Sequence, residues 1–239
     1  MSDKFRRLLI VAAGLFCVLV FMLSPVFNFE EISVSGNLQI YNDEILERAG
    51  LDGAVNFFMF SPRRARQQVM ENHFIDQVVF RRVFPNELEI TVWERFLSGY
   101  IEYLEGMFLY IDENGRVIEV RSYKTEDLPV VTGLRFTHMQ IGEILEVDNP
   151  AAFSTVVTFA QLLNRHDLTG VISQIDVSDP NNTRIRVYNM EVYLGDTSNA
   201  HEKISTLREI VNEWPGAREV RGFLDLREPS AQYIFRILT

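Results

Sequence analysis

The residues of this chain that could take part in chemistry do not stand at the spacings that catalysis requires. Its histidines are scattered, at positions His73, His138, His166 and His201. His201-Glu202 could open an H-E-x-x-H zinc motif, but the position of the second histidine holds Ser205. The sequence has no G-x-S-x-G elbow, phosphate-binding P-loop or dinucleotide-binding glycine motif. We therefore predict that the protein is not an enzyme, has no small-molecule substrate and holds no metal or other cofactor.

A group of acidic and amide side chains near residue 180 could be read as a calcium loop. Asp176, Asp179 and Asn181 carry suitable oxygen atoms, but their spacing differs from that of an EF-hand and Pro180 lies among them. Asp and Asn are also the residues that most often cap their own backbone in turns. We expect an Asx-type turn here.

Composition excludes several classes of protein. The chain has 239 residues, of which 47% are hydrophobic and 12% aromatic, as in a folded protein. Its formal net charge of -10 disfavours a nucleic-acid partner, because neutralising phosphates requires a concentrated basic surface. Cys17 is the single cysteine, so an internal disulfide or a multi-cysteine metal site is excluded.

One local cluster of basic residues departs from this acidic background. Arg63, Arg64 and Arg66 open a helix, and Arg81 and Arg82 lie on the strand that follows. They could face anionic lipid headgroups or an acidic protein. The alternative is a solvated face, because cations at a helix N-terminus gain nothing from the helix dipole. The sequence leaves lipid and protein open.

The last strand of the chain, residues 232–238, carries large apolar residues on both faces. Tyr233, Phe235 and Ile237 fall on one face, and Ile234 and Leu238 on the other. If the strand is a sheet edge, it invites pairing with a strand of another chain. If it is a central strand buried on both faces, it needs no partner. Both alternatives remain open.

The elements that position these features form two modules, and the predicted fold class is α+β. Residues 28–97 read as β-α-α-β-β, with Asn42 and Ser61 as helix N-caps and Pro62 at the first helical position. Residues 98–239 are mixed α/β and rich in strands, with helices that begin near Asn149-Pro150 and near Ala200.

Residues 8–27 are an apolar run without a charged side chain. About 20 helical residues cross a hydrocarbon core of roughly 30 Å, which predicts a transmembrane helix over 8–27. Lys4, Arg6 and Arg7 precede the run, so residues 1–7 are expected to be a cytoplasmic tail and the remainder to lie outside. A cleavable signal peptide is the alternative, but no small-residue cleavage pattern follows the run. We predict a single-pass protein of the cell membrane.

Short motifs follow one another along nearly the whole chain. They are Val34-Ser35-Gly36-Asn37, Asn56-Phe57-Phe58, Pro85-Asn86, Leu88–Val92, Glu94-Arg95, Ile111-Asp112, Gly115, Leu128-Pro129, Gly133, Leu194-Gly195, Lys203 and Asp225-Leu226-Arg227. In order and spacing this set resembles the FtsQ/DivIB family of bacterial cell division proteins. The resemblance implies a POTRA (polypeptide-transport-associated) domain at 28–97, an FtsQ/DivIB-type β domain at 98–239 and no enzymatic activity.

The resemblance also implies partners and a place of action. Family members act as scaffolds at the division septum, where they bind the bitopic coiled-coil proteins FtsB/DivIC and FtsL and so regulate the septal peptidoglycan synthase. By position, the partner-binding residues would be Arg227, Ser230, Tyr233, Ile234, Phe235 and Arg236. The chain departs from many relatives at Glu228-Pro229, where an aromatic and small residues are usual.

Two other functions compete with this reading. A POTRA-bearing chaperone or envelope-assembly module outside division is expected to continue in many alternating strands, whereas residues 98–239 contain two clear helices. An extracytoplasmic enzyme of cell-wall metabolism requires a nucleophile or metal site, and the sequence offers none.

Overall fold

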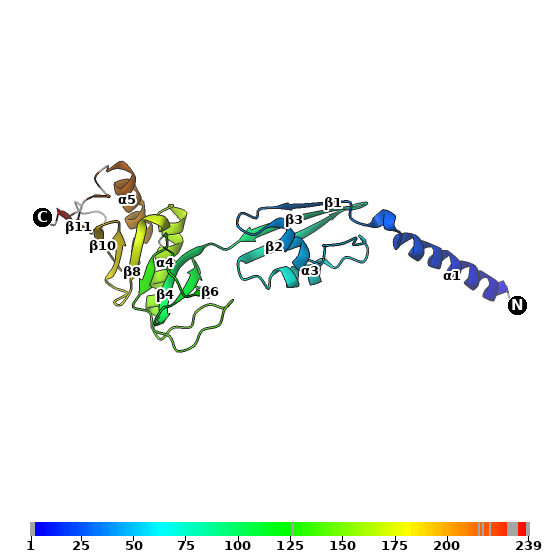
Figure 1. The fold of residues 1–239 in the computed structure, drawn as a ribbon, viewed down its shortest axis with the longest axis horizontal. Helices are drawn as coiled ribbons and strands as arrows, with labels where there is room; N and C mark the ends of the chain where they lie inside the picture. The colour runs from blue at the N-terminus through cyan, green and yellow to red at the C-terminus, as the bar shows by residue number, and fades with distance from the viewer. Residues whose placement is uncertain are drawn as a thin grey trace. The chain divides into compact units, whose positions relative to one another are not determined.

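The chain divides into two compact units, Met1–Arg95 and Phe96–Thr239, in a computed structural model (Figure 1). The structure describes residues 3–125, 127–214, 216, 218–219, 221–228 and 234–237. Each unit has its own hydrophobic core, and each is described by itself.

The first unit begins with helix α1 (Asp3–Met22), which is followed by the short 3-10 helix η1 (Pro25–Phe27). The prediction of a transmembrane helix over 8–27 is wrong: within the described residues, no helix combines the length and the apolar character that a membrane span needs. The physical reason is the early end of α1. Its apolar part, Leu8 to Met22, rises about 22 Å at 1.5 Å per residue, which is short of a hydrocarbon core of roughly 30 Å. Ser24 then caps η1, and Pro25 stands at its first position.

The rest of the first unit has the expected β-α-α-β-β order. Its elements are β1 (Glu31–Ser35), α2 (Asn42–Arg48), α3 (Pro62–Val69), β2 (Ile75–Val83) and β3 (Glu87–Glu94). The sheet order is β1-β3-β2, with β1 parallel and β2 antiparallel to the central β3.

Local sequence explains most of these boundaries. The Ser61 hydroxyl accepts a hydrogen bond from the Arg64 amide at 3.4 Å, and Pro62 opens α3, as the sequence predicts. The prediction for Asn42 is wrong, because Tyr41 is the N-cap of α2 and Asn42 is already helical. The side-chain oxygen of Asn42 instead accepts a hydrogen bond from the side-chain amide of Asn37 at 2.8 Å, which holds the loop before the helix in place.

The described strands of the second unit form one nine-stranded sheet of order β12-β11-β10-β9-β8-β7-β4-β5-β6. The strands are β4 (Leu97–Leu104), β5 (Met107–Asp112), β6 (Val117–Arg121), β7 (Val130–Thr132), β8 (Ile172–Asp176), β9 (Thr183–Val187), β10 (Met190–Gly195), β11 (Gly222–Asp225) and β12 (Ile234–Ile237). The helices are α4 (Pro150–Arg165), α5 (Ala200–Glu213) and the 3-10 helix η2 (Thr169–Val171).

Both long helices contribute to the core on one face of this sheet. Asn149 caps α4 by accepting hydrogen bonds from the amides of Ala151 and Ala152, at 3.1 and 3.3 Å. Phe159 of α4 and Ile204 of α5 are fully buried in the same core as alternate residues of β9, β10 and β11. The residues between those buried positions therefore point to the opposite, outer face of the sheet.

Among the described residues, side chains cover the outer face at one end of the sheet. Over β4 and β5, Tyr100, Phe108 and Tyr110 form a small second core, and the buried Tyr110 hydroxyl donates to the Tyr123 carbonyl at 3.0 Å. Over β9 to β11, no such cluster of buried side chains forms among the described residues. This open region is where the candidate site lies.

Candidate functional site

The C-terminal strand lies at one end of the nine-stranded sheet. β12 pairs antiparallel with β11, with Ile234 opposite Asp225 and Ile237 opposite Gly222, and in the described chain no strand pairs with its other side. The sequence left open whether this strand is an edge or a central strand. Among the described strands, β12 is an edge strand. An edge strand directs every second backbone N–H and C=O outward, and an added strand uses those groups as its template.

Two of the six residues predicted to bind a partner have described side chains. Arg236 is exposed on β12, and its guanidinium lies 5.7 Å from the centre of the Phe223 ring. Arg227 lies two residues after the end of β11, and 53% of its side chain is exposed. The fold thus brings both arginines to the same end of the sheet.

The other four residues divide equally. Ile234 and Phe235 lie in β12 and pair with β11. Ser230 and Tyr233 fall outside the described residues, as does Pro229 of the Glu228-Pro229 departure. Partner binding by all six residues stays a prediction.

Arginine and aromatic side chains meet on the outer face beside this edge. Tyr193 of β10 has two guanidinium groups over its ring, that of Arg184 at 5.2 Å and that of Arg227 at 5.7 Å. Phe223 of β11 contacts Tyr193 edge to face, with 6.1 Å between ring centres. We call this set the arginine–aromatic face: Arg184, Tyr193, Phe223, Arg227 and Arg236. Exposed cation–π contacts contribute only about 0.5–1 kcal/mol each, so their main effect is to hold the guanidinium groups in place.

The charges of this face are partly compensated. Arg227 donates to both carboxylate oxygens of Asp225, from Nε at 2.9 Å and from Nη2 at 2.5 Å. This hydrogen-bonded pairing lowers the pKa of Asp225 and raises the pKa of Arg227, so both are charged at neutral pH. Arg184 lies 3.6 Å from Glu191, whereas no described carboxylate pairs with Arg236. The cation nearest the edge is thus available to a partner's carboxylate.

A buried lysine supports the position of Arg227 from behind. Lys203 of α5 is 1% exposed, and its ammonium group donates to the Asp196 carbonyl at 2.9 Å. This bond fixes the start of the loop after β10, next to Gly195, the last residue of the strand, which has a φ of +69°. A Cβ atom at Gly195 would lie 3.0 Å from Cγ of Arg227, so glycine permits the arginine stem to cross the loop closely.

Sequence reasoning missed Tyr193 and Arg184 as neighbours of the predicted edge. A signal is present, because apolar residues alternate with Arg184 and Tyr193 along β9 and β10. The order of strands in the sheet is not encoded in such local patterns. Only the topology shows that β10 lies next to β11 and that Tyr193 is opposite Asp225.

Two of the histidines, expected to be scattered, lie together. The rings of His166, at the end of α4, and His201, at the start of α5, are 5.4 Å apart. Burial of the His166 ring lowers its pKa, and His201, Arg208 and Arg165 lower it further. His166 is therefore neutral at physiological pH, and the surrounding cations oppose metal binding.

The acidic residues near position 180 form turns. Asp176 accepts a hydrogen bond from the Ser178 amide and Asp179 accepts one from the Asn181 amide, both at 3.0 Å. Hydrogen bonds from Ser178 lower the pKa of Asp176 although its burial acts in the other direction. Across the described residues, no group of three or more metal-binding side chains is present.

The arginine cluster that the sequence singled out belongs to the first unit. Arg63, Arg64 and Arg66 are exposed on α3, and no described carboxylate forms an ion pair with them. Arg81 of β2 pairs with Glu89 at 3.2 Å, and Arg82 donates to the Phe57 carbonyl at 3.0 Å.

Two family models match the chain, one in each unit. Residues 27–95 match the POTRA domain of the FtsQ type, and residues 104–222 match a model described as FtsQ/DivIB, C-terminal related. The second match ends at the first residue of β11, so β12 lies beyond it.

Named relatives agree with both matches. The cell division protein DivIB of Clostridium botulinum strain Hall is 24% identical over 226 residues, which cover 93% of this chain and 88% of that protein. DivIB of Clostridium acetobutylicum is 28% identical and covers 82% of this chain and 78% of its own length. The cell division protein FtsQ of Syntrophotalea carbinolica is 29% identical over a stretch that covers 72% of this chain and 58% of that protein. The chain therefore belongs to the FtsQ/DivIB family of cell division proteins.

Proposed function

We propose that this protein is a noncatalytic scaffold of the bacterial divisome. It binds FtsB/DivIC-type and FtsL-type coiled-coil proteins at the division septum, and through them it acts on septal peptidoglycan synthesis. The membership of the FtsQ/DivIB family and the names of the relatives support a role in cell division. The candidate site supports assembly rather than catalysis, because it offers an edge strand and guanidinium groups but no nucleophile beside a base.

The observation that carries the proposal is the position of β12 at the end of the sheet. The partner adds a strand along its outer side, so that backbone hydrogen bonds supply affinity. The arginine–aromatic face lies next to that added strand. Arg236 and Arg227 then bind carboxylates that flank the partner's strand, which adds specificity to the backbone pairing.

Arg236→Glu is expected to weaken binding of the FtsB/DivIC-type partner from the same genome by about tenfold or more, roughly 1.4 kcal/mol. The reversed charge repels the partner's carboxylates at the edge. Isothermal titration calorimetry with the purified partner measures the effect, and circular dichroism confirms that the fold is retained.

Arg186→Glu is the matched control. Arg186 is exposed on the same outer face, in β9 instead of β12, and belongs to the same row as Glu191, Phe223 and Arg236. Its reversal should leave the affinity unchanged. Equal losses in the two variants would show that the partner responds to general charge and not to the edge.

A further inference from the structure

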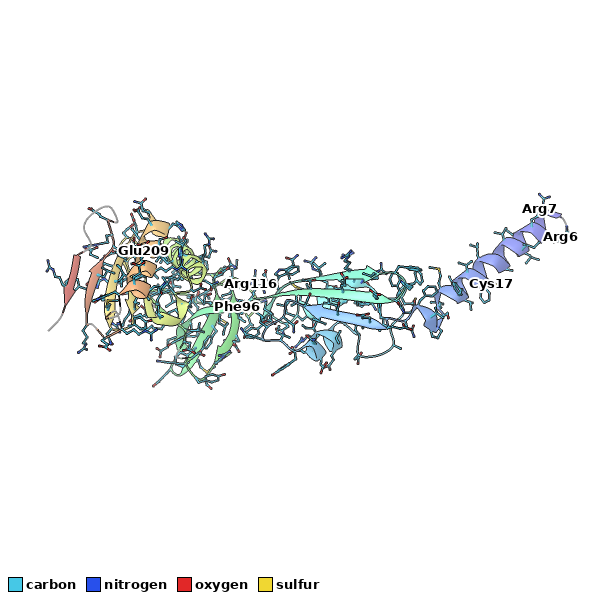
Figure 2. The ribbon with its side chains drawn as sticks, turned by 90° about the horizontal axis from the view of Figure 1, so that it is seen from above. Arg6, Arg7, Cys17, Phe96, Arg116 and Glu209 are labelled. Carbon is cyan, nitrogen blue, oxygen red and sulfur yellow. The ribbon has the colours of Figure 1, made fainter. Side chains whose placement is uncertain are left out.

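The outer surface of α2 and α3 carries exposed charged side chains. Both helices bury their other side against the sheet of the first unit, through Ile45 of α2 and through Ala65 and Val69 of α3. In Figure 2 the helices of this unit lie on one side of its sheet, and their side chains extend away from it. The charges of that outer surface therefore belong to neither the core nor the sheet.

Four side chains form one stripe along this surface. Arg64, Gln67, Gln68 and Glu71 are exposed, and their i, i+3, i+4, i+7 spacing places them on one side of a helix. Glu71 continues the turn of α3, because its amide donates to the Gln68 carbonyl at 3.2 Å. We call these four residues the α3 stripe. It begins with a cation and ends with an anion, and in the described chain neither Arg64 nor Glu71 forms an ion pair.

The order of these charges is the reverse of the order that stabilises a helix. Anions are favoured at a helix N-terminus and cations at its C-terminus. α2 follows this preference, with Asp43 and Glu44 in its first turn and Arg48 in its last. α3 has Arg64 and no acidic residue in its first turn, and Glu71 follows its end. Helix stability therefore does not explain the charges of the α3 stripe.

A groove of about 400 Å³ borders the acidic end of the stripe. It is lined by side chains of α2 and of the last part of α3: Glu44, Glu47, Arg48, Gln68 and Glu71. Arg48 pairs with Glu44 at 3.0 Å, and no described cation pairs with Glu47 or Glu71. These two carboxylates suit a guanidinium group from another molecule.

We propose that the α3 stripe binds the same stripe of a second copy of the chain about a two-fold axis, with the two α3 helices antiparallel. If Gln67 of one copy lies opposite Gln68 of the other, Arg64 of each copy meets Glu71 of the other beside the groove. A parallel arrangement would bring like charges together. Because the stripe is polar and exposed, the association is weak and decreases with salt. It is independent of the proposed scaffold function, which rests on the second unit.

Cross-linking between cysteines tests whether the two stripes meet. The full chain carries Cys17→Ser, and Gln67→Cys places one thiol beside the expected two-fold axis. Ser33→Cys is the matched control, because Ser33 is exposed on β1 between Ile32 and Val34, which face the core and the helices. A short bismaleimide should join two copies severalfold more through position 67 than through position 33. The yield at position 67 should fall as the salt concentration rises.

Charge reversal tests the pairing itself. Arg64→Glu should lower the yield at position 67 severalfold, because it places carboxylates opposite each other. Adding Glu71→Arg restores opposite charges across the interface and should restore the yield. Both changes follow the helix-dipole preference, so α3 remains folded. Arg66→Glu should leave the yield unchanged, since Arg66 is exposed two residues after Arg64 and lies on nearly the opposite side of the helix.

Three results would each overturn the proposal. Equal yields at positions 67 and 33 would show that the copies do not meet at α3. A double variant whose yield stays as low as that of Arg64→Glu would show that Arg64 does not pair with Glu71 of the second copy. Equal losses for Arg64→Glu and Arg66→Glu would assign the effect to net charge. None of these results bears on partner binding by the second unit.

Discussion

Gly133→Ala is expected to lower the free energy of unfolding of the second unit by about 3–5 kcal/mol. Gly133 follows β7 with a φ of +93°, and an added Cβ atom would lie 2.2 Å from the Ser178 amide nitrogen and 2.6 Å from its Cα. The obstruction is backbone, and it cannot move away, because the Val177 amide donates to the Thr132 carbonyl at 2.9 Å. The backbone strain at positive φ and the steric overlap with Ser178 therefore both lower the free energy of unfolding.

Two control glycines separate these causes. Gly106 has a φ of +77° but open space around its Cβ position, so Gly106→Ala should cost only the strain, about 1 kcal/mol. Gly170 has neither feature, and Gly170→Ala should be neutral or slightly stabilising. Urea unfolding can be followed by the fluorescence of Trp214 alone in a Trp93→Phe background, because each unit holds one tryptophan. If Gly133→Ala lowers the free energy of unfolding no more than Gly106→Ala does, the close contact between Gly133, after β7, and Ser178, after β8, does not have the expected effect.

Lys203→Ala is expected to cost about 3 kcal/mol, and Lys203→Met about 1 kcal/mol. Alanine removes the buried stem as well as the hydrogen bond to the Asp196 carbonyl, whereas methionine keeps the packed volume and loses this bond and the 3.5 Å contact with the Asp196 carboxylate. Urea unfolding measures both losses.

The methionine variant also connects this lysine to the site. With the loop at Gly195 no longer held by Lys203, the stem of Arg227 loses its support. We expect Lys203→Met to bind the FtsB/DivIC-type partner severalfold more weakly while it remains folded. Unchanged affinity in a folded Lys203→Met protein would show that Arg227 is positioned without the loop.

Local signals in the sequence account for much of this fold. Ser61-Pro62 and Asn149-Pro150 are complete helix starts, and both helices begin where these residues predict. The sequence prediction placed the end of the first helix too late, because a run of apolar residues shows composition but does not fix where a helix ends. That end depends on Ser24 and Pro25 and on Asn56, a residue more than thirty positions away in sequence that bonds to the Met22 carbonyl.

The sequence alone could point to the last strand of the chain, but not to the residues of other strands that lie beside it. Arg227 and Arg236 are named by their positions in the family resemblance, and their role in partner binding stays a prediction. Tyr193 and Arg184 could not be identified, because their place beside the edge depends on the order of β9, β10 and β11 in the sheet. The contact of His166 with His201 was missed for the same reason, since it depends on how α4 packs beside α5.

Backbone amide exchange at residues 234–237, with and without the FtsB/DivIC-type partner, tests the central claim most directly. If the partner adds a strand to β12, the amides of alternate residues gain protection on binding, because every second N–H of an edge strand points outward. β6, at the other end of the sheet, should exchange at the same rate in both states. Partner binding that leaves the exchange of residues 234–237 unchanged would contradict strand addition at this edge.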